Sequence, residues 1–459
     1  MAPLTCFKSY DIRGRLGAEL NEAVAARIGR GFAQELGVER PGLVRVVLGR
    51  DCRDSSASLA AAVSAGLQEA GAEVLDLGLC GTEEVYFATA HFGAAGGIAV
   101  TASHNPMDYN GMKLVGAGAA PLQPGLWARI RARAEAGDFA AAAPGSWTAV
   151  DARQTYVERV LSFVDLAALR PLTLLVNAGN GAAGPTFDAI AAELARRGAP
   201  LRFHRMDHAP DGSFPNGIPN PLLVENQPRT AAAVRACGAD FAVAWDGDFD
   251  HCFFFDQDGG FVAGEYVVGL LAEVFLAKEP GAVVIHDPRI IWNTQDVVAR
   301  AGGRARMAPT GHAYLKAAMR ETGAVYGGER SAHHYFRDFM ACDSGMIPWL
   351  LVAELISRRG LGLKEILAER RAAFPSSGEV NFRVGDAQAT MRRVAAIYAP
   401  LALARDDLDG LSLGFGNWRL NLRASNTEPL LRLNVEARGR ADLVAEKLAE
   451  VSAVIRQRG

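Results

Sequence analysis

The sequence predicts an α/β protein with three similar α/β domains that contain mixed sheets, plus a smaller C-terminal α+β domain, arranged around one central cleft. First, short apolar runs alternate with alanine- and leucine-rich helical patterns through most of the chain. Second, three of these apolar runs end in polar loops. Third, the last segment changes to alternating strand patterns joined by short loops. The 459 residues correspond to about three domains, give or take one, at roughly 100–200 residues each.

The first expected domain covers residues 1–147. Apolar and β-branched runs predict its strands, and a stretch rich in alanine and leucine that opens with serines predicts a helix. In order, these elements are Leu43–Gly49, the helix Ser55–Glu69, Ala72–Leu77 and Gly96–Thr101. The segment Ala140–Trp147 is small, contains Gly and Pro, and lacks periodicity, which predicts a linker.

The next two expected domains, residues 148–256 and 257–371, repeat this alternation. The second domain is predicted to contain the strand Leu172–Asn177, the helix Pro185–Arg197 and the strand Phe241–Trp245. The third is predicted to contain the helix Glu265–Leu276, the strand Ala282–His286, the helix Gly311–Met319 and the strand Ala324–Tyr326. Residues Met346–Ile356 are apolar but too few to span a membrane, so they predict a buried helix.

The fourth expected domain, residues 372–459, has a different pattern. Alternating apolar and polar residues predict strands, and helical periodicity precedes and follows them. The expected elements are Val380–Val384, the helix Ala387–Tyr398, the strands Trp418–Leu422 and Leu430–Val435, and the helix Arg440–Arg456. This order predicts a small α+β domain.

Charge and cysteine content restrict the partners and the compartment. The formal net charge of −3 gives no overall attraction to nucleic acid or acidic membranes. Six cysteines lack a CxxC pair or a metal-ligand spacing, which favours free thiols in a reducing cytoplasm. The N-terminus has no signal-peptide pattern, and no apolar run reaches about 18 residues. We therefore expect a cytoplasmic protein without a nucleic-acid or membrane partner.

The loop after the third predicted strand, TASHNP at 101–106, places a hydroxyl beside an imidazole. A serine next to a base is a candidate nucleophile, and the alternative is an ordinary polar turn that caps a helix. Lys113 follows closely enough in the chain to share the same site.

A second loop alternates aspartates, at Asp246, Asp248 and Asp250. In an extended loop these carboxylates point the same way, where they repel one another unless a cation lies between them. Oxygen-only ligation suits Mg²⁺. An EF-hand is excluded because the loop positions that require Gly and Glu hold His251 and Gln257. A solvated acidic turn is the weaker alternative because both flanking segments are apolar.

Two further loops carry binding groups. Glu329 and Ser331 suit sugar hydroxyls, and His333 suits proton transfer, although a surface turn is an equal alternative for this segment. The fourth loop offers the planar donor fork of Arg423 with three short polar donors, a set suited to a phosphate dianion. These three donors are Ser425, Asn426 and Thr427. The alternative is a hairpin turn with a surface arginine.

Together, these loops supply a nucleophile, a metal cage, a polyol-binding acid and a phosphate clamp. Phosphoryl transfer needs little more, because its catalysis is mainly positioning and charge neutralisation. The sequence contains no GxxxxGK[ST] motif, and Gly179-Asn180-Gly181 lacks the third glycine of a dinucleotide fingerprint. Nucleotide chemistry is therefore disfavoured.

The combination of TASHNP, the triple-aspartate loop, GGExS and RxSNTEP resembles the α-D-phosphohexomutase superfamily, specifically its bacterial phosphomannomutase/phosphoglucomutase members. The resemblance extends from the YDIRG segment at 10–14 to the loop at 423–429. It implies reversible phosphoryl transfer between the 1- and 6-positions of mannose and glucose phosphates, through a phosphoserine and a hexose 1,6-bisphosphate. The implied cofactors are Mg²⁺ and that bisphosphate, and the implied state is a monomer or weak dimer.

The resemblance also implies the site residues. Ser103 carries the phosphoryl group and binds Mg²⁺ with Asp246, Asp248 and Asp250. The catalytic set is Ser103, His104, Lys113, Arg13 and His333. The substrate-binding set is Tyr10, Arg13, His312, Glu329, Ser331, His333, Arg423, Ser425, Asn426 and Thr427. Lys113 is the first choice for general base, which requires a depressed pKa, and His104 and His333 are the alternatives.

Two positions depart from the family pattern. His251 stands where the family usually has arginine, and Arg330 replaces an apolar residue. A neutral histidine offers one donor where arginine offers five. We hypothesise that Arg330 compensates, which an unchanged turnover of Arg330→Met would contradict. The open alternatives for function are a phosphoglucosamine mutase, a metal-dependent sugar phosphatase and a non-catalytic phosphosugar sensor.

Overall fold

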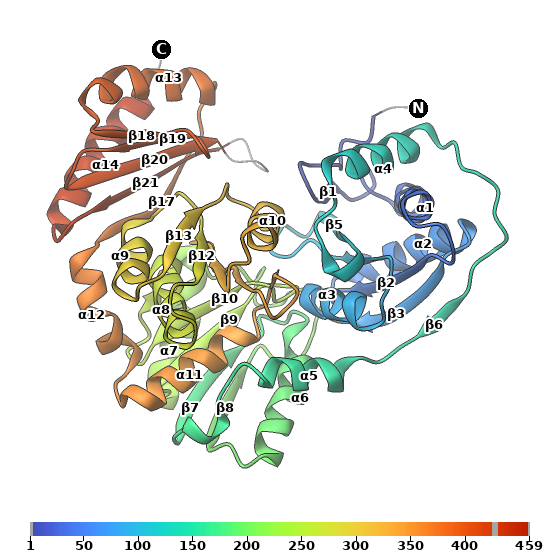
Figure 1. Cartoon of the computed structure of the whole chain (residues 1–459), viewed down its shortest axis with the longest axis horizontal. Coiled ribbons are helices and arrows are strands. Elements are labelled where there is room, and N and C mark those ends of the chain that lie inside the picture. Colours follow the sequence, from blue (N-terminus) through green and yellow to red (C-terminus); the bar gives the residue numbers. More distant parts are fainter. Residues whose placement is uncertain (1–2, 425–429, 458–459) are drawn as a thin grey trace. The chain divides into compact units, whose positions relative to one another are not determined.

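The computed structural model describes residues 3–424 and 430–457. The chain forms two compact units, which we describe separately (Figure 1). The first unit contains Met1–Phe261 and His333–Gly360, and the second contains Val262–Ala332 and Leu361–Gly459.

The first sheet of the first unit is mixed, with strand order β1-β5-β4-β2-β3-β6. Its strands are β1 (Ile12–Arg15), β2 (Arg45–Arg50), β3 (Glu73–Leu79), β4 (Gly96–Val100), β5 (Tyr109–Gly116) and β6 (Trp147–Ala149). β2 runs parallel to β3 and β4, and β5 runs antiparallel to β1 and β4. All five residues of β4 are buried, as expected for a strand covered on both faces.

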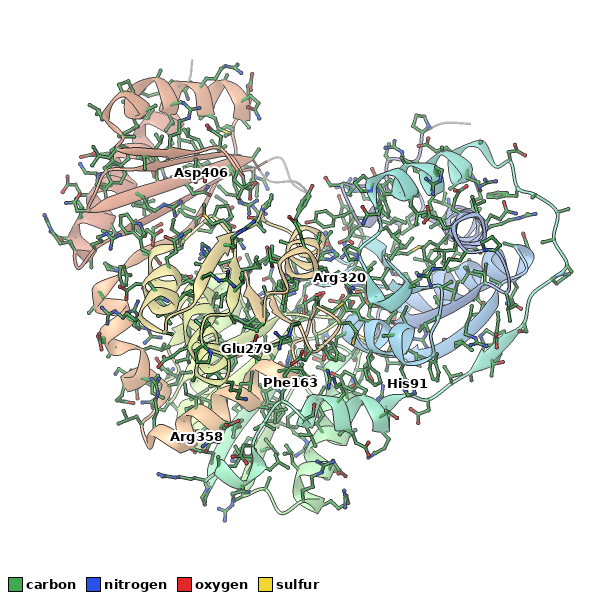
Figure 2. All side chains as sticks on the ribbon, in the orientation of Figure 1. His91, Phe163, Glu279, Arg320, Arg358 and Asp406 are labelled. Atoms are coloured by element: carbon green, nitrogen blue, oxygen red, sulfur yellow. The ribbon has the colours of Figure 1, made fainter. Side chains whose placement is uncertain are left out.

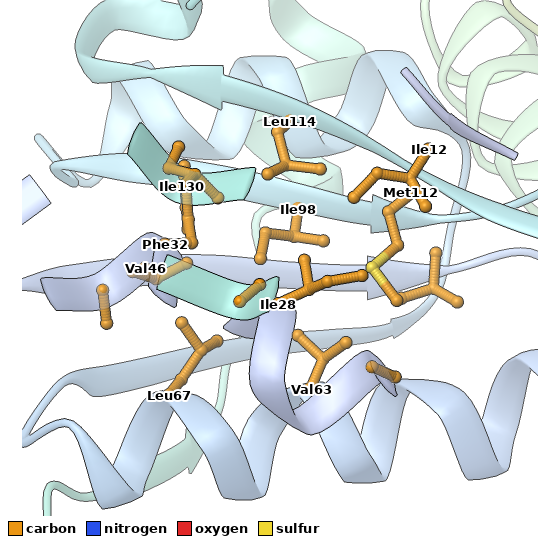
Figure 3. Packing of buried hydrophobic residues seen from close by; sticks show 14 of the residues in the cluster. Ile12, Ile28, Phe32, Val46, Val63, Leu67, Ile98, Met112, Leu114 and Ile130 are labelled. Atoms are coloured by element: carbon orange, nitrogen blue, oxygen red, sulfur yellow. The ribbon is translucent and has the colours of Figure 1, made fainter. Parts of the chain in front are cut away.

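Three helices cover one face of this sheet, α1 (Glu22–Glu39), α2 (Asp54–Glu69) and α4 (Pro124–Ala136). Figure 3 shows Phe32, Val63 and Ile130 of these helices packed with Ile98 of β4, and all four side chains are fully buried. Burial of each such apolar side chain stabilises the fold by about 1.5–3 kcal/mol. This core fixes the position of the central strand β4 and therefore the start of the loop that follows it.

The opposite face carries α3 (Thr82–His91), which approaches the sheet closely. A Cβ atom on Gly97 would lie 2.2 Å from the Thr89 hydroxyl oxygen, and one on Gly49 would lie 2.7 Å from Val85. The absence of side chains at these glycines therefore permits the close packing of α3. The packing places the first turn of α3 beside the aspartate loop described below.

A second sheet in the first unit contains β10 (Cys252–Asp256), β9 (Phe241–Trp245), β7 (Leu172–Asn177) and β8 (Leu201–Met206), side by side in this order. β9 is parallel to β7 and antiparallel to β10. The accompanying helices are α5 (Arg153–Leu161), α6 (Ala183–Arg196) and α7 (Gln227–Cys237). β9, like β4, is buried throughout and ends directly in a polar loop.

The first unit also includes the hairpin of β15 (His334–Phe336) with β16 (Cys342–Asp343), followed by α11 (Ile347–Arg359). Polar contacts tie α11 to the preceding fold. Arg358, labelled in Figure 2, donates to Asp165 at 2.7 Å, and the backbone amide of Arg170 donates to the Ser357 hydroxyl at 3.0 Å. The apolar run Met346–Ile356 is thus part of a buried helix, as predicted.

The second unit begins at Val262, the last residue of β11 (Phe261–Val262). In it, β12 (Val283–His286) pairs in parallel with β13 (Arg304–Met307) and β14 (Tyr326–Gly328). Its helices are α8 (Gly264–Lys278), α9 (Trp292–Arg300), α10 (His312–Thr322) and α12 (Leu363–Ala373). Glu329 and Ser331 follow β14 directly, so the third predicted loop lies at the carboxyl end of a strand.

The remaining part of the second unit is an antiparallel sheet with order β17-β21-β20-β19-β18. The strands are β17 (Ser376–Phe382), β18 (Ala404–Asp406), β19 (Leu411–Gly414), β20 (Trp418–Ala424) and β21 (Leu431–Ala437). Helices α13 (Ala387–Tyr398) and α14 (Ala441–Arg456) pack on it around a separate core that includes Val394, Leu420 and Val451. Arg423 lies near the end of β20, before the fourth predicted loop.

The predicted fold class, three α/β domains with mixed sheets and a smaller C-terminal α+β domain, is confirmed. The predicted strands Leu172–Asn177 and Phe241–Trp245 and the helix Ala387–Tyr398 have the observed bounds. The expected linker Ala140–Trp147 is mostly exposed coil, but its last residue begins β6. Among the described residues, every helix is too short or too polar to cross a membrane. The shared central cleft stays a prediction.

Candidate active site

Ser103 lies in the loop that follows β4 and is buried, with 3% of its surface exposed. Its backbone has a φ of 52°, a left-handed conformation that is uncommon outside glycine. The backbone amide donates to the Thr101 hydroxyl at 2.9 Å, and the Ser103 hydroxyl lies 3.0 Å from His104 Nδ1. These contacts fix the hydroxyl beside an imidazole.

Hydrogen bonds from Arg53 support the backbone of this loop. Its guanidinium donates to the backbone carbonyls of Ser103 at 2.9 Å, Asn105 at 2.5 Å and Pro106 at 3.2 Å. Arg53 is itself buried, and its Nε lies 3.7 Å from the Asp51 carboxylate. The left-handed turn at Ser103 is therefore stabilised by three hydrogen bonds from one planar cation.

The aspartate loop follows β9 and contacts the Ser103 loop directly. Ser103 Oγ donates to Asp246 Oδ2. Gly247 permits this approach, because a Cβ atom there would lie 2.6 Å from the Ser103 carbonyl oxygen. The carboxylates of Asp246, Asp248 and Asp250 are buried and offer ligand atoms within 4.8 Å of one another. The structure thus brings the predicted nucleophile and the predicted metal cage together.

The carboxylates fit a hard divalent cation. They form an oxygen-only donor set, and Asp248 Oδ1 is buried without a hydrogen-bond partner in the described part of the chain. Burial and repulsion from Asp250 raise the pKa of Asp248. Its other oxygen is oriented by the Thr82 hydroxyl at 2.6 Å, at the start of α3. A cation that binds Asp248 Oδ1 would satisfy that oxygen and offset the repulsion.

Two side chains contribute positive charge to this cluster. Lys113 extends from β5 to Asp248 Oδ2 at 2.8 Å and also contacts Asp250. Burial opposes the charge on Lys113, but Asp248 and Asp250 outweigh it and raise the pKa of this ammonium group. The expected depression of the Lys113 pKa is therefore wrong, since the shift is opposite to the one that a general base requires, and the role of Lys113 as general base stays a prediction.

His251 lies between two of the aspartates. Its Nδ1 is 2.9 Å from Asp246 Oδ2 and 3.0 Å from Asp250 Oδ1. Burial opposes the charged imidazolium, but these two carboxylates raise the pKa of His251 well above its ordinary value. Burial would raise the pKa of both carboxyl groups, but His251 lowers the pKa of Asp246, and Lys113 together with His251 lowers the pKa of Asp250. His251 therefore supplies a positive charge at the position where the family pattern has arginine.

Other predicted residues of the first unit surround this cluster. His104 is partly exposed, and His333 Nε2 lies 3.7 Å from Asp250 Oδ2. Arg13, on β1, donates to the Thr101 carbonyl, and Tyr10 is half-buried in the bend before that strand. The structure thus places His104, His333 and Arg13 at the cluster or the loop that carries it.

In the second unit, Arg289 connects the predicted sugar-binding residues. Its Nη2 lies 3.2 Å from the Ser331 hydroxyl and 3.7 Å from Glu329 Oε1. Glu329 also accepts a hydrogen bond of 2.9 Å from the backbone amide of Gly311. That contact places Glu329 beside the start of α10, where His312 is the first residue and is half-buried.

Arg423 belongs to a buried arginine cluster centred on Glu379. The Glu379 carboxylate lies 3.5 Å from Arg423, 3.6 Å from Arg289 and 3.2 Å from Arg432. Burial would raise the pKa of Glu379, but Arg289 and its neighbours, including Arg330, lower it to about 2. The Nε groups of Arg289 and Arg423 are buried and have no hydrogen-bond acceptor among the residues that the structure describes. This cluster has the charge and donors to bind an anion.

Three residues of the predicted phosphate clamp, Ser425, Asn426 and Thr427, lie outside the described residues. Arg330, the second departure from the family pattern, belongs to the second unit, where its Nε is 3.6 Å from Glu265 Oε2. Its compensation for His251 stays a prediction, which the Arg330→Met variant tests.

We expect Glu379→Gln to lower the free energy of unfolding of the second unit by about 3–5 kcal/mol at neutral pH, because it leaves several buried arginines without their shared counter-charge. The folded-state pKa of Glu379 is lowered from 4.5 to about 2. The stabilisation that the Glu379 carboxylate provides is therefore present at pH values above its pKa in the unfolded state. It is lost as the pH falls through its pKa in the folded state.

Urea unfolding at neutral and at acidic pH measures the difference in free energy of unfolding between wild type and Glu379→Gln. The difference should be largest near neutrality and shrink towards acid. Glu321→Gln, on the exposed end of α10, serves as the control. An equal unfolding midpoint for Glu379→Gln and wild type at neutral pH would contradict the assignment of Glu379 as counter-ion.

Several residues of the site were missed in the sequence. Arg53 and Thr82 lie far in the chain from the loops that they support, and neither belongs to a recognisable motif. Arg289 follows the predicted strand Ala282–His286, so a search for charged residues at the carboxyl end of every strand would find it. Glu379 precedes an alternating strand pattern and carries no comparable signal.

Comparison with known proteins matches family models to four successive segments. The models are described as phosphoglucomutase/phosphomannomutase alpha/beta/alpha domain I at residues 5–141, domain II at 154–260, domain III at 263–374, and the C-terminal domain at 379–454. These matches together cover most of the chain.

Individual relatives match over the full length. A phosphomannomutase of Salmonella montevideo is 55% identical over 98% of this chain and 99% of its own. A protein named phosphohexose mutases, from Xanthomonas campestris pv. campestris strain B100, is 54% identical over 99% of both chains. A crystal structure of a phosphoglucomutase/phosphomannomutase family protein from Burkholderia thailandensis superposes with a TM-score of 0.88 at 31% identity, over 100% of this chain and 99% of that one. The chain therefore belongs to the phosphoglucomutase/phosphomannomutase family, whose members are phosphohexomutases, isomerases that carry out intramolecular phosphoryl transfer on hexose phosphates.

Proposed function

We propose that this chain moves a phosphoryl group reversibly between the 1- and 6-positions of mannose and glucose phosphates, through a phosphoserine at Ser103 and a hexose 1,6-bisphosphate. Membership of the family supports the reaction class. The observation that carries the proposal is the contact between the Ser103 hydroxyl and Asp246, one of three buried carboxylates suited to a divalent cation. Phosphoryl transfer requires this proximity of nucleophile and metal ligand.

Ser103, Asp246, Asp248 and Asp250 would hold Mg²⁺. When bound, the ion would neutralise charge on the phosphoryl oxygens during transfer. The protein's own contribution is to fix the Ser103 hydroxyl, through the turn that Arg53 supports, and to exclude water by burial. Positioning of this kind is the main source of catalysis in phosphoryl transfer.

Lys113 and His251 act in this proposal as fixed positive charges beside the transferring group, because their carboxylate neighbours favour the protonated forms. The proton of the substrate hydroxyl then needs another acceptor. His104, whose Nδ1 lies 3.0 Å from the Ser103 hydroxyl, and His333, beside Asp250, are the candidates. Arg13 and Tyr10 are proposed substrate contacts.

The arginine cluster around Glu379 is proposed to bind the phosphate that is not reacting. Arg423 and Arg289 would supply planar donors, and Ser425, Asn426 and Thr427 are proposed to complete the clamp. Glu329, Ser331 and His312 would bind sugar hydroxyls. Holding one phosphate while the other end reacts distinguishes a mutase from a simple phosphatase, which has no need for such a clamp.

The proposal also includes the activator, the substrates, the compartment and the oligomeric state. The activator is expected to be glucose or mannose 1,6-bisphosphate, which phosphorylates Ser103 and re-forms during each turnover. The protein is expected to act on small hexose phosphates as a cytoplasmic monomer or weak dimer.

A coupled assay with mannose 1-phosphate and glucose 1-phosphate tests the proposed function. We expect formation of the 6-phosphate in both cases, dependent on Mg²⁺ and bisphosphate, with little free phosphate. Release of inorganic phosphate without 6-phosphate would identify a phosphatase instead. A much higher rate with glucosamine 1-phosphate would favour a phosphoglucosamine mutase.

We expect Arg53→Lys to lower kcat about 100-fold while leaving KM nearly unchanged, because a small displacement of a reacting group costs about that factor. Lysine keeps the positive charge but cannot donate to three carbonyls in the geometry of the guanidinium. The assay is steady-state kinetics, with Arg40→Lys on an exposed position as the control. An increase in KM alone would show that Arg53 affects substrate binding rather than the nucleophile.

A further inference from the structure

His251 gives the aspartate cluster a donor type that an all-oxygen magnesium site lacks. Its Nδ1 lies 2.9 Å from Asp246 Oδ2, and His104 Nδ1 lies 3.4 Å from the same oxygen. Potential ligand atoms of His104, Asp246 and His251 lie within 4.8 Å of one another. Two imidazoles and one carboxylate form a donor set typical of Zn²⁺ and chemically similar cations.

The spacing of these atoms fits a tetrahedral ion. A tetrahedron with metal–ligand bonds of about 2.0–2.1 Å has edges of about 3.3 Å. The edges observed among the Ser103 hydroxyl, His104 Nδ1, Asp246 Oδ2 and His251 Nδ1 include values of 3.0, 3.4 and 2.9 Å. The Ser103 hydroxyl lies beside these three atoms and would be a fourth ligand once its closer contact with Asp246 Oδ2 lengthens on ion binding.

A second imidazole pair is less suitable. Asp250, His251 and His333 also form a close group. The rings of His251 and His333, however, lie nearly face to face, with centroids 3.6 Å apart and planes inclined by 38°. The rings of His104 and His251 are nearly perpendicular, with centroids 5.4 Å apart, which allows two nitrogens to converge on one point without a ring clash.

We propose that His104, Asp246 and His251, with the Ser103 hydroxyl, form a binding site for a borderline-soft divalent cation of the Zn²⁺ class, distinct from the oxygen-only site formed by the three aspartates. The two sites share Asp246, so their occupation is mutually exclusive. Nitrogen donors favour Zn²⁺ and Co²⁺ over Mg²⁺, which takes oxygen ligands. The cation replaces the proton that His251 Nδ1 otherwise shares with Asp246 and Asp250, because only the neutral imidazole binds a metal ion, and that proton is released to solvent. If the proposed role of Ser103 is correct, Zn²⁺ at this site blocks the nucleophile and inhibits the enzyme.

Co²⁺ titration of the chelator-stripped protein tests the site without any measurement of turnover. Co²⁺ has a visible absorption spectrum that is intense in tetrahedral coordination and weak in octahedral coordination. We expect one equivalent of Co²⁺ to produce an intense spectrum, and Zn²⁺ to abolish it by displacement. His251→Arg, which keeps a positive charge between the aspartates, should lose the spectrum and bind Zn²⁺ at least about 100-fold more weakly.

Three variants test whether the spectrum comes from this site and not from the oxygen-only site or from another histidine. Asp248→Asn removes a ligand of the oxygen-only site and should retain the intense spectrum. His333→Asn should retain it too, as should His204→Gln, which removes an exposed imidazole elsewhere. Circular dichroism establishes that each variant is folded. An intense spectrum in folded His251→Arg, its loss in Asp248→Asn or His333→Asn, or only a weak octahedral spectrum in wild type would overturn the proposal.

Discussion

Ser103→Ala is expected to abolish mutase activity with mannose 1-phosphate and glucose 1-phosphate, with a loss of kcat on the order of 10⁴-fold or more. Removal of a covalent nucleophile typically has effects of this size or larger, because the remaining groups cannot form the intermediate. Serine and alanine both carry a Cβ atom and neither is β-branched, so the substitution adds no bulk at the left-handed backbone of residue 103, and the fold should be retained. The coupled assay measures the loss, and thermal unfolding measures the stability.

The matched control is Ser162→Ala, which removes an exposed serine hydroxyl at the end of α5. It should have wild-type turnover. Ser103→Ala should also remain unphosphorylated when incubated with hexose 1,6-bisphosphate, as measured by intact mass. Substantial mutase activity in Ser103→Ala would contradict the proposed phosphoserine pathway, whatever the effect on stability.

Asp248→Asn is expected to lower kcat by about 10²–10³-fold, since it removes one charged ligand from the group that stabilises the transferring phosphoryl. The same change should raise the thermal unfolding midpoint of the metal-free protein. Burial and the repulsion from Asp250 disfavour the charge of Asp248 in the folded state, and its raised pKa reports this cost. Functional sites commonly sacrifice stability in this way.

Thermal unfolding with and without Mg²⁺ provides the second measurement. Mg²⁺ should raise the midpoint of wild type by preferential binding to the folded state, and this increase should disappear in Asp248→Asn. Asp258→Asn, an exposed aspartate after β10, should behave like wild type. An unchanged response to Mg²⁺ in Asp248→Asn would exclude Asp248 from the metal site.

The Ser103 loop and the aspartate loop could each be located from the sequence because each lies directly after an apolar strand, whereas their contact, which joins two different sheets, was implied only by the family resemblance. β4 and β9 are buried along their whole lengths, and such strands end at predictable places. The polar residues of these loops also form recognisable patterns. Local signals of this kind, a buried strand followed by functional groups, require no knowledge of long-range contacts.

The electrostatic environment of Lys113 could not be predicted in the same way. The sequence indicates that Lys113 lies near Ser103. It does not reveal the two contacts of Lys113 with aspartates more than a hundred residues later in the chain. Those contacts reverse the expected direction of the Lys113 pKa shift. Arg53 and Glu379 were missed for a related reason, since their partners come from distant segments and neither residue belongs to a periodic pattern or motif.

The elements themselves were predicted unevenly. Strands buried on both faces, such as Phe241–Trp245, are continuous apolar runs and were located with the observed bounds. The edge strand β1 is short and contains two arginines, so its sequence resembles a loop. Only its pairing with β5, residue by residue from Ile12 opposite Met112, identifies it as a strand.

Rapid-quench labelling with radioactive glucose 1,6-bisphosphate addresses the proposed pathway most directly, because it follows the phosphoryl group itself. The account predicts that label appears on the peptide containing Ser103 at least as fast as turnover, that it passes to unlabelled hexose 1-phosphate, and that Ser103→Ala takes up none. Full turnover without label on Ser103, or label on His104 instead, would contradict it.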